Sequence, residues 1–193
     1  MEKLIKIFKQ NKGYLSSSEL TGRTMRYQLQ KMIDDGSVSK LKRGVYCLNE
    51  ELSKRQMIDT ERIIPQSVLC LFSAWSHYNL SLSIPNSYYL AIEKSRKVSI
   101  PEFPLINIVY LKKEYFELGI IEKEIEDIKV KIYDIEKSVC DAVKYRNKIG
   151  MEITSEVIRN YLANKKRNIN KLVEYAKKMR IYNTLKMYIE VQL

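Results

Sequence analysis

Few cysteines and a single histidine limit the chemistry that this 193-residue chain can perform. Cys47, Cys70 and Cys140 are odd in number and far apart, they form no C-x-x-C pair, and His77 is the only imidazole. A structural zinc site usually needs four such ligands at short, regular spacing. We therefore expect no metal site and no cofactor, and we expect three reduced, buried cysteines of the kind found in cytosolic proteins.

Long apolar runs are also missing. Nothing approaches the roughly 18 consecutive apolar residues that a transmembrane helix requires. The opening stretch "MEKLIKIFKQNK" has a charge every few residues, unlike a signal peptide. These features predict a cytoplasmic protein with no membrane partner.

The usual catalytic motifs are absent as well. The sequence has no G-x-S-x-G elbow, no Walker A motif and no G-x-G-x-x-G loop. One alternative remains, a metal-dependent phosphoryl-transfer site built on Asp134, Glu136 and Asp141. We favour a structural interpretation in which Asp134 caps a helix and Lys137 pairs with Asp141 at i,i+4. We therefore expect no catalytic residues and no enzymatic activity.

Positive charge is what the sequence has in excess. The net charge is +11, and it is unevenly distributed. Residues 1–48 carry +6 and residues 137–193 carry +8, whereas the segment between them carries −3. Two basic ends favour a polyanionic partner, and nucleic acid fits better than a membrane because no amphipathic anchor or lipidation signal is present.

Residues 1–48 show the pattern of three short helices followed by a hairpin. Gly13 and Gly36 sit where helices end, and one of Ser16, Ser17 or Ser18 can cap the second helix. The expected elements are a helix over 2–12, a short helix through Glu19 and Leu20, a helix over 23–35, and a hairpin over 37–48 that turns at Arg43-Gly44. This order predicts a winged helix-turn-helix.

The third helix would enter the major groove of double-stranded DNA. Met25, Leu29 and Met32 recur at helical spacing and would face the core. The opposite face and the hairpin carry side chains that can bind bases or phosphates. The expected DNA-binding residues are Arg23, Thr24, Arg26, Tyr27 and Gln30 on the helix, and Lys40, Lys42 and Arg43 on the hairpin.

The remainder of the chain predicts a second, α+β domain. Residues 49–66 resemble a linker that runs into a helix, and residues 67–193 alternate between strand and helix patterns. The expected elements are a helix within 67–80, strands over 88–93 and 105–111, an antiparallel pair over 119–134, and helices over 135–145, 154–164, 170–180 and 183–191, the last three capped by Thr154, Asn170 and Asn183. The predicted fold is α+β, a winged helix-turn-helix followed by a domain with a small antiparallel sheet and C-terminal helices.

The C-terminal excess of positive charge suggests a second basic surface. Its centre would be Lys165, Lys166, Arg167, Lys177 and Lys178. These residues would contact phosphates beside the site read by the N-terminal domain. Two other interpretations stay open, an ordinary solvated face and a surface that acts on a protein partner.

Three stretches resemble the AbiEi antitoxin family of bacterial type IV toxin–antitoxin, abortive-infection systems. They are "GYLSSSEL…RYQLQKMIDDGSVSKLKRGVYCL", "LCLFSAWSHYNLS" and "VKIYDIEKSVCDAVKYRNKIGMEI". The resemblance covers nearly the whole chain, and "LKRGVY" and "IYDIEKSVCDAVKYRNKIG" are its most specific parts. It implies phage resistance through an antitoxin that represses its own operon by binding inverted repeats.

The resemblance further implies a nucleotidyltransferase-like toxin that is countered without a stable complex. We expect a monomer in solution that binds its operator cooperatively, because the chain has no heptads for a stable dimer. A nucleic-acid-processing enzyme is one rival interpretation. A plain protein-interaction module, which would copurify with the toxin, is the other.

Overall fold

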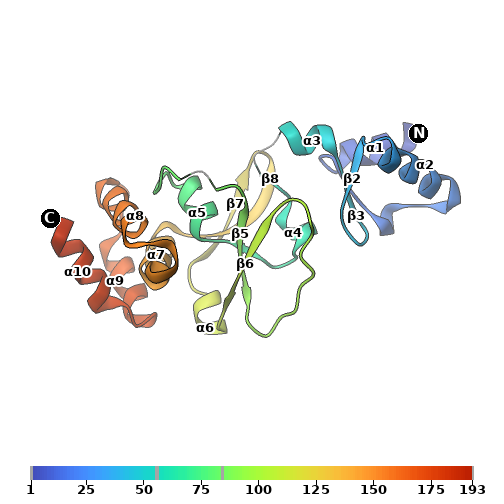
Figure 1. The fold of residues 1–193 in the computed structure, drawn as a ribbon. Coiled ribbons are helices and arrows are strands. Elements are labelled where there is room, and N and C mark those ends of the chain that lie inside the picture. The colour runs from blue at the N-terminus through green and yellow to red at the C-terminus, as the bar shows by residue number, and fades with distance from the viewer. Residues whose placement is uncertain (1, 55–56, 84, 193) are drawn as a thin grey trace. The chain divides into compact units, whose positions relative to one another are not determined.

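The computed structural model describes residues 2–54, 57–83 and 85–192 and divides the chain into two compact units. The first unit consists of Met1–Pro65, Val98–Pro104 and Glu124–Lys129, and the second of Gln66–Lys97, Leu105–Lys123 and Val130–Leu193. Helices and sheets occur in one chain, so the α+β class predicted from the sequence is confirmed (Figure 1).

The first unit combines short helices with a three-stranded antiparallel sheet. Its elements are α1 (Glu2–Gln10), β1 (Tyr14–Ser16), the 3₁₀ helix η1 (Ser17–Glu19), α2 (Gly22–Asp34), β2 (Val38–Lys42), β3 (Val45–Leu48), α3 (Asn49–Lys54) and α4 (Thr60–Ile63). The strand order is β1-β3-β2, so the first strand lies on the outer side of the hairpin's second strand.

An apolar core holds these elements together. Leu4 and Phe8 of α1 are fully buried against Leu15 and the inward face of α2. The turn after α1 requires Gly13, because its φ is +91° and a Cβ there would lie 2.5 Å from Cγ of Glu51. Strand β1 follows directly, and its pairing with β3 closes the sheet over the core. The sequence pattern did not predict this three-residue strand.

The expected linker, residues 49–66, contains two short helices and contributes to the core. Ile58, Ile63 and Ile64 are buried. Asp59 caps α4 by accepting a hydrogen bond from the Arg62 amide at 3.1 Å. Residues 55 and 56 of this segment lie outside the described residues.

The second unit packs helices against a five-stranded sheet. Its elements are β4 (Val68–Leu69), α5 (Leu71–His77), β5 (Tyr88–Glu93), β6 (Ile106–Leu111), α6 (Lys113–Phe116), β7 (Ile120–Ile125), β8 (Ile128–Tyr133), α7 (Ile135–Ile149), α8 (Met151–Ala163), α9 (Ile169–Lys178) and α10 (Tyr182–Gln192). The strand order is β6-β5-β4-β8-β7, and the turn of the β7–β8 hairpin is grouped with the first unit.

The expectation of an antiparallel sheet is wrong for this unit. Strand β5 runs parallel to β6 with Tyr88 opposite Ile106, and β4 runs parallel to β8 with Leu69 opposite Ile132. Only local hairpins can be read from consecutive strand patterns, whereas parallel neighbours need a crossover of a dozen or more residues. The long segment between β5 and β6 supplies such a crossover.

Helices α7 to α10 gather on one side of the sheet, with α7 nearest to it (Figure 1). Helix α7 was predicted over 135–145, and its residues Val139, Ala142 and Val143 are fully buried. The predicted N-caps on the following helices are wrong. Thr154 lies inside α8, because Gly150 with φ +94° allows that helix to begin earlier, and the cap of α9 is Asn168.

The structure also bears on the predictions about the cysteines and about membrane-spanning helices. Cys47, Cys70 and Cys140 are buried, as predicted. Among the described residues, no helix combines the length and the apolar character that crossing a lipid bilayer requires.

Candidate functional site

The outer face of α2 is the first candidate site. Met25, Leu29 and Met32 point into the core, which confirms the predicted stripe and leaves the opposite face in solvent. That exposed face carries the five helix residues singled out from the sequence, Arg23, Thr24, Arg26, Tyr27 and Gln30. Tyr27 is 73% exposed.

Two sets of polar contacts lie around this helix, one before its first residue and one that involves the Gln30 side chain. Before α2, the Ser16 amide donates to the Glu19 carboxylate at 2.6 Å, which closes η1, and Glu19 lies 3.5 Å from an Arg62 guanidinium nitrogen. On α2 itself, the Gln30 amide donates to the Asp34 carboxylate at 2.8 Å. This bond lies on the surface, so the Gln30 side chain can exchange it for another partner.

The β2–β3 hairpin has an irregular register that decides where its basic residues point. A bulge between Lys40 and Lys42 shifts the pairing with β3, so that Val38 and Leu41 are both buried. Lys40 and Arg43 remain exposed. Lys42 is half-buried, and its ammonium donates to the Ile63 carbonyl. Burial lowers the pKa of Lys42, and this side chain is already used within the unit.

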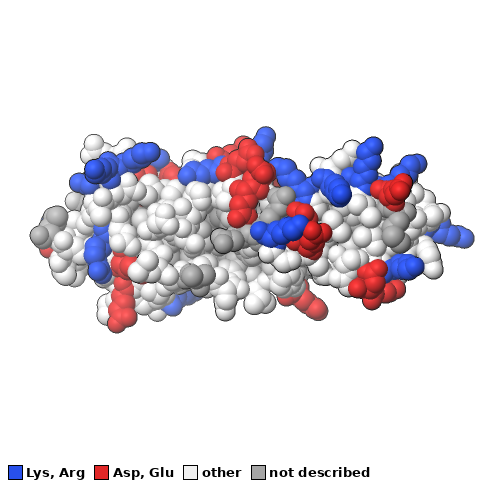
Figure 2. Space-filling model, turned by 90° about the horizontal axis from the view of Figure 1, so that it is seen from above, with Lys and Arg blue, Asp and Glu red and all other residues white. Residues whose placement is uncertain are grey.

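The first unit therefore presents one basic helix face and one basic hairpin tip. Lys and Arg side chains project from this unit, in the right-hand part of Figure 2. Guanidinium groups on a helix and cations on a neighbouring hairpin are the groups that proteins use to bind base edges and phosphates.

The predicted second basic surface is divided between the two ends of one helix. Lys165, Lys166 and Arg167 are exposed in the turn before α9, whereas Lys177 and Lys178 lie in its last turn. The ten residues of α9 separate the two groups by about 15 Å at the usual rise per residue. Lys178 also forms a surface ion pair with Glu174 at 2.7 Å.

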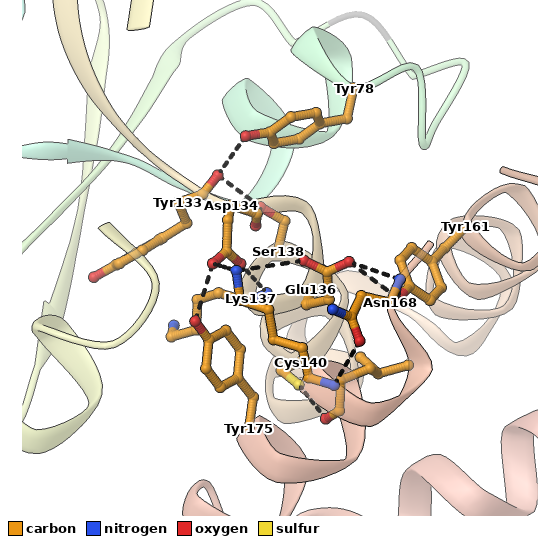
Figure 3. A network of polar contacts seen from close by, with 12 residues as sticks. Tyr78, Tyr133, Asp134, Glu136, Lys137, Ser138, Cys140, Tyr161, Asn168 and Tyr175 are labelled. Carbon is orange, nitrogen blue, oxygen red and sulfur yellow. Dashed lines mark hydrogen bonds and ion pairs between the residues drawn. The ribbon is translucent and has the colours of Figure 1, made fainter. Parts of the chain in front are cut away.

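Two of the three acids of the alternative enzymatic interpretation, Asp134 and Glu136, belong to a buried polar network around the start of α7 (Figure 3). The third, Asp141, is buried further along the same helix. Asp134 is the helix cap, as predicted, and its Oδ1 accepts from the Lys137 amide at 2.8 Å. Its Oδ2 accepts from the Tyr175 hydroxyl at 3.0 Å and lies 2.9 Å from the Lys171 ammonium. Hydrogen bonding to Asp134 raises the pKa of Lys171, and burial beside Asp134 raises that of Tyr175 to about 12.

Glu136 extends the network to the two following helices. Its Oε1 accepts from the Tyr161 hydroxyl at 3.2 Å and from the Asn168 amide at 3.1 Å. The Asn168 side chain in turn caps α9 by accepting from the Lys171 amide at 3.0 Å. One carboxylate thus links the last turn of α8 to the start of α9.

The predicted pairing of Lys137 with Asp141 is confirmed. Their charged atoms lie 2.6 Å apart, and the Lys137 ammonium stands 4.1 Å from the centre of the Tyr133 ring. Burial raises the pKa of Asp141, and the nearby Lys137 cation opposes this rise. Each of the three acids is bound by donors from the protein itself. Among the described residues, no group of three His, Cys, Asp or Glu side chains is placed to hold a metal ion.

Tyr161, Asn168 and Tyr175 were not singled out from the sequence. An asparagine before an apolar helix pattern was the one available signal, and "NINK" offers two such asparagines, Asn168 and Asn170. His77 is the last residue of α5. Its Nε2 is 3.1 Å from the Lys123 ammonium, and burial together with this cation lowers the pKa of His77.

Comparison with known proteins leaves the family unassigned. No family model matches the chain, and no curated protein is similar to it in sequence.

Proposed function

We propose that the chain is a sequence-specific DNA-binding protein whose first unit is a winged helix-turn-helix. The observation that carries this proposal is the exposed polar face of α2 beside the β2–β3 hairpin. The succession of α1, η1 and α2 before that hairpin, with strand order β1-β3-β2, supports it. In this interpretation η1 and α2 are the helix-turn-helix, α2 lies in the major groove, and the hairpin is the wing.

The chemistry of each side chain suggests the DNA group that it contacts. Arg23 and Arg26 can each fork onto O6 and N7 of a guanine, and Gln30 can bind adenine after releasing Asp34. Tyr27 can contact a phosphate or a thymine methyl group. On the hairpin, Arg43 and Lys40 bind phosphates, whereas Lys42 holds the hairpin against the Ile63 carbonyl.

We further propose that this DNA-binding protein is the antitoxin of a type IV toxin–antitoxin, abortive-infection system and the repressor of its own operon. The resemblance of the stretches around "LKRGVY" and "IYDIEKSVCDAVKYRNKIG" to AbiEi antitoxins supports this role. Its operator would be a pair of inverted repeats bound cooperatively by monomers. Its partner would be a nucleotidyltransferase-like toxin that it counters without a stable complex.

Titration against DNA tests the first proposal. The full chain is titrated with a duplex from upstream of its own gene and with a shuffled duplex of the same composition, both at about 150 mM salt, because affinities depend steeply on salt. We expect the upstream duplex to bind at least about a hundredfold more tightly. Equal affinity for both duplexes would overturn sequence-specific binding.

Co-expression tests the antitoxin role separately. Expression of the neighbouring toxin gene alone should arrest growth, and expression of this chain in trans should restore it without copurification of the two proteins. Arg23→Ala with Arg26→Ala should abolish repression of the operon while rescue from a foreign promoter persists. Growth arrest that the chain does not relieve would reject the antitoxin role and leave DNA binding untouched.

A further inference from the structure

A cleft in the second unit collects positive charge at the ends of two parallel strands. Strands β5 and β6 end side by side with Glu93 opposite Leu111, and the chain continues from them into Lys94 and Lys112. The Lys94 amide donates to the Leu111 carbonyl at 2.7 Å, which keeps these two ends together. In sheets with parallel strands, the carboxyl edge is where ligands usually bind.

The opposite wall comes from the C-terminal helices. Lys144 and Lys148 of α7 and Arg180, in the turn after α9, line the same cleft, whose volume is about 640 Å³. This size lies within the range of small-molecule sites. Five cations thus converge from three parts of the unit, and no carboxylate of the described residues lines the cleft with them.

Two of the basic side chains in the cleft, Lys144 and Lys148, contact a carbonyl group or aromatic rings and not carboxylates. The Lys144 ammonium donates to the Met179 carbonyl at 3.2 Å and stands 5.0 Å from the centre of the Tyr115 ring. The Lys148 ammonium lies 5.8 Å from the Tyr145 ring. Within the part of the chain that the structure describes, none of the five cations forms an ion pair with a carboxylate. Like charges that converge in this way repel one another, and an anion would relieve that repulsion.

An aromatic surface accompanies the charge. Tyr110, two residues before Lys112 on β6, is 49% exposed and lines the cleft, and Tyr115 and Tyr145 line it as well. Tyrosine rings are platforms on which nucleobases stack, and lysines beside them bind the phosphates of the same ligand. The cleft therefore has partners for both halves of a nucleotide.

We propose that this cleft binds a nucleoside phosphate, with the phosphates on Lys94, Lys112 and Lys148 and the base against Tyr110. The site is built from the second unit alone and does not involve the DNA-binding face proposed on α2. It takes either a free nucleotide or a nucleotide at the end of a nucleic-acid strand, because both present the same phosphate and ring.

Calorimetry on the full chain tests this site with four probes: ATP, adenosine, inorganic tripolyphosphate and a single-stranded oligonucleotide that carries a 5′-phosphate. We expect ATP or the oligonucleotide to bind, and adenosine to bind at least tenfold more weakly than ATP. Whichever of the two binds more tightly identifies the source of the nucleotide. Absence of binding by both, or equal binding of ATP and adenosine, would overturn the proposal.

Substitutions locate the binding. Lys112→Glu and Lys148→Glu should each weaken nucleotide binding about tenfold or more, and Lys186→Glu, an exposed lysine of α10 outside the cleft, should leave it unchanged. Tyr110→Ala should weaken ATP about tenfold but leave tripolyphosphate unaffected, because only the base stacks. If Tyr110→Ala weakened the binding of ATP and of tripolyphosphate equally, the base would not stack on Tyr110 and this part of the proposal would be wrong.

A last comparison separates the cleft from the DNA surface. The same variants are titrated with the upstream duplex, and we expect no change in duplex affinity. Loss of duplex affinity in the cleft variants, with no nucleotide bound by the unsubstituted chain, would assign these lysines to the DNA backbone and overturn the proposal. Failure of duplex binding in all proteins would reject the proposed function while nucleotide binding still stood.

Discussion

Lys137 and Asp141 form a 2.6 Å salt bridge along one turn of α7, with 0% and 2% of their side chains exposed. The Asp141 Oδ2 atom has no hydrogen-bond partner in the described structure, so the pair is only partly satisfied. A buried ion pair of this kind adds little net stability, because desolvation offsets the attraction. Removing one partner, however, leaves a buried charge without compensation.

Replacing only one member of this pair should therefore be costly. We expect Lys137→Met to lower the free energy of unfolding by about 3–5 kcal/mol, and Lys137→Met with Asp141→Leu to lower it by less than the single change. Urea unfolding followed by circular dichroism measures both. A double variant as unstable as the sum of the two single variants would contradict this account of the pair.

The close approach of Gly119 to the network predicts a second stability effect. A Cβ at Gly119 would lie 2.8 Å from Lys137 Cβ and 3.1 Å from Asp134 Oδ2, at φ +73°. Gly150 also has a positive φ, of +94°, but open space around it, so it is a matched control. We expect Gly150→Ala to cost about 1–2 kcal/mol for backbone strain alone and Gly119→Ala clearly more. Equal melting temperatures for the two variants would show that the network tolerates the added methyl group.

The single histidine gives a pH-dependent prediction. Burial and the Lys123 cation lower the pKa of His77 in the folded state below its usual 6.5. Between the two pKa values the unfolded chain binds more protons, so this residue makes stability fall as the pH drops below about 6.5. His77→Gln should lose less stability between pH 7.5 and pH 5 than the natural chain.

NMR titration of the imidazole provides the direct measurement, because the chain has only one. A folded-state pKa at or above 6.5 would contradict the environment described for His77. So would an unchanged pH dependence of stability in His77→Gln.

Local patterns predicted individual elements better than their assembly. The spacing of Met25, Leu29 and Met32 predicted α2, and the β-rich stretches predicted β5 and β6 within a residue of their bounds. The parallel pairing of β5 with β6 could not be predicted, because it depends on a crossover whose path leaves no periodic signal. Strand β1 was missed because three residues are too few to show alternation.

In the candidate site, too, local patterns predicted some features, whereas features that depend on contacts between distant segments were missed. Exposure of Arg23 and Arg26 followed from helix periodicity alone, since the apolar stripe fixes the opposite face. The orientation of Lys42 did not follow, because it depends on a bulge and on a carbonyl in a distant segment. The contact of Glu136 with Asn168 also joins residues far apart in sequence, which a reading of neighbours cannot reveal.

Two of the three basic residues of the hairpin, Arg43 and Lys42, should behave differently in DNA binding. Arg43 is exposed, so Arg43→Ala should weaken binding to every duplex and lower the slope of log affinity against log salt by about one unit. Lys42 is engaged with Ile63, so Lys42→Ala should change that slope much less and should lower the melting temperature instead. Equal slope changes in both variants would mean that Lys42 leaves its carbonyl and binds a phosphate.

The central claim is that α2 lies in a major groove and reads guanines through Arg23 and Arg26. Dimethyl sulfate methylates guanine N7, an atom that only the major groove exposes, so protection of the upstream duplex from this reagent measures the claim most directly. We expect protected guanines in each repeat. Arg23→Ala and Arg26→Ala should each abolish protection at one position and cost roughly 1–3 kcal/mol in affinity, whereas Arg159→Ala on α8 should change neither. Guanines that stay reactive in a saturated complex, or protection that survives both substitutions, would contradict the placement of α2 in the groove.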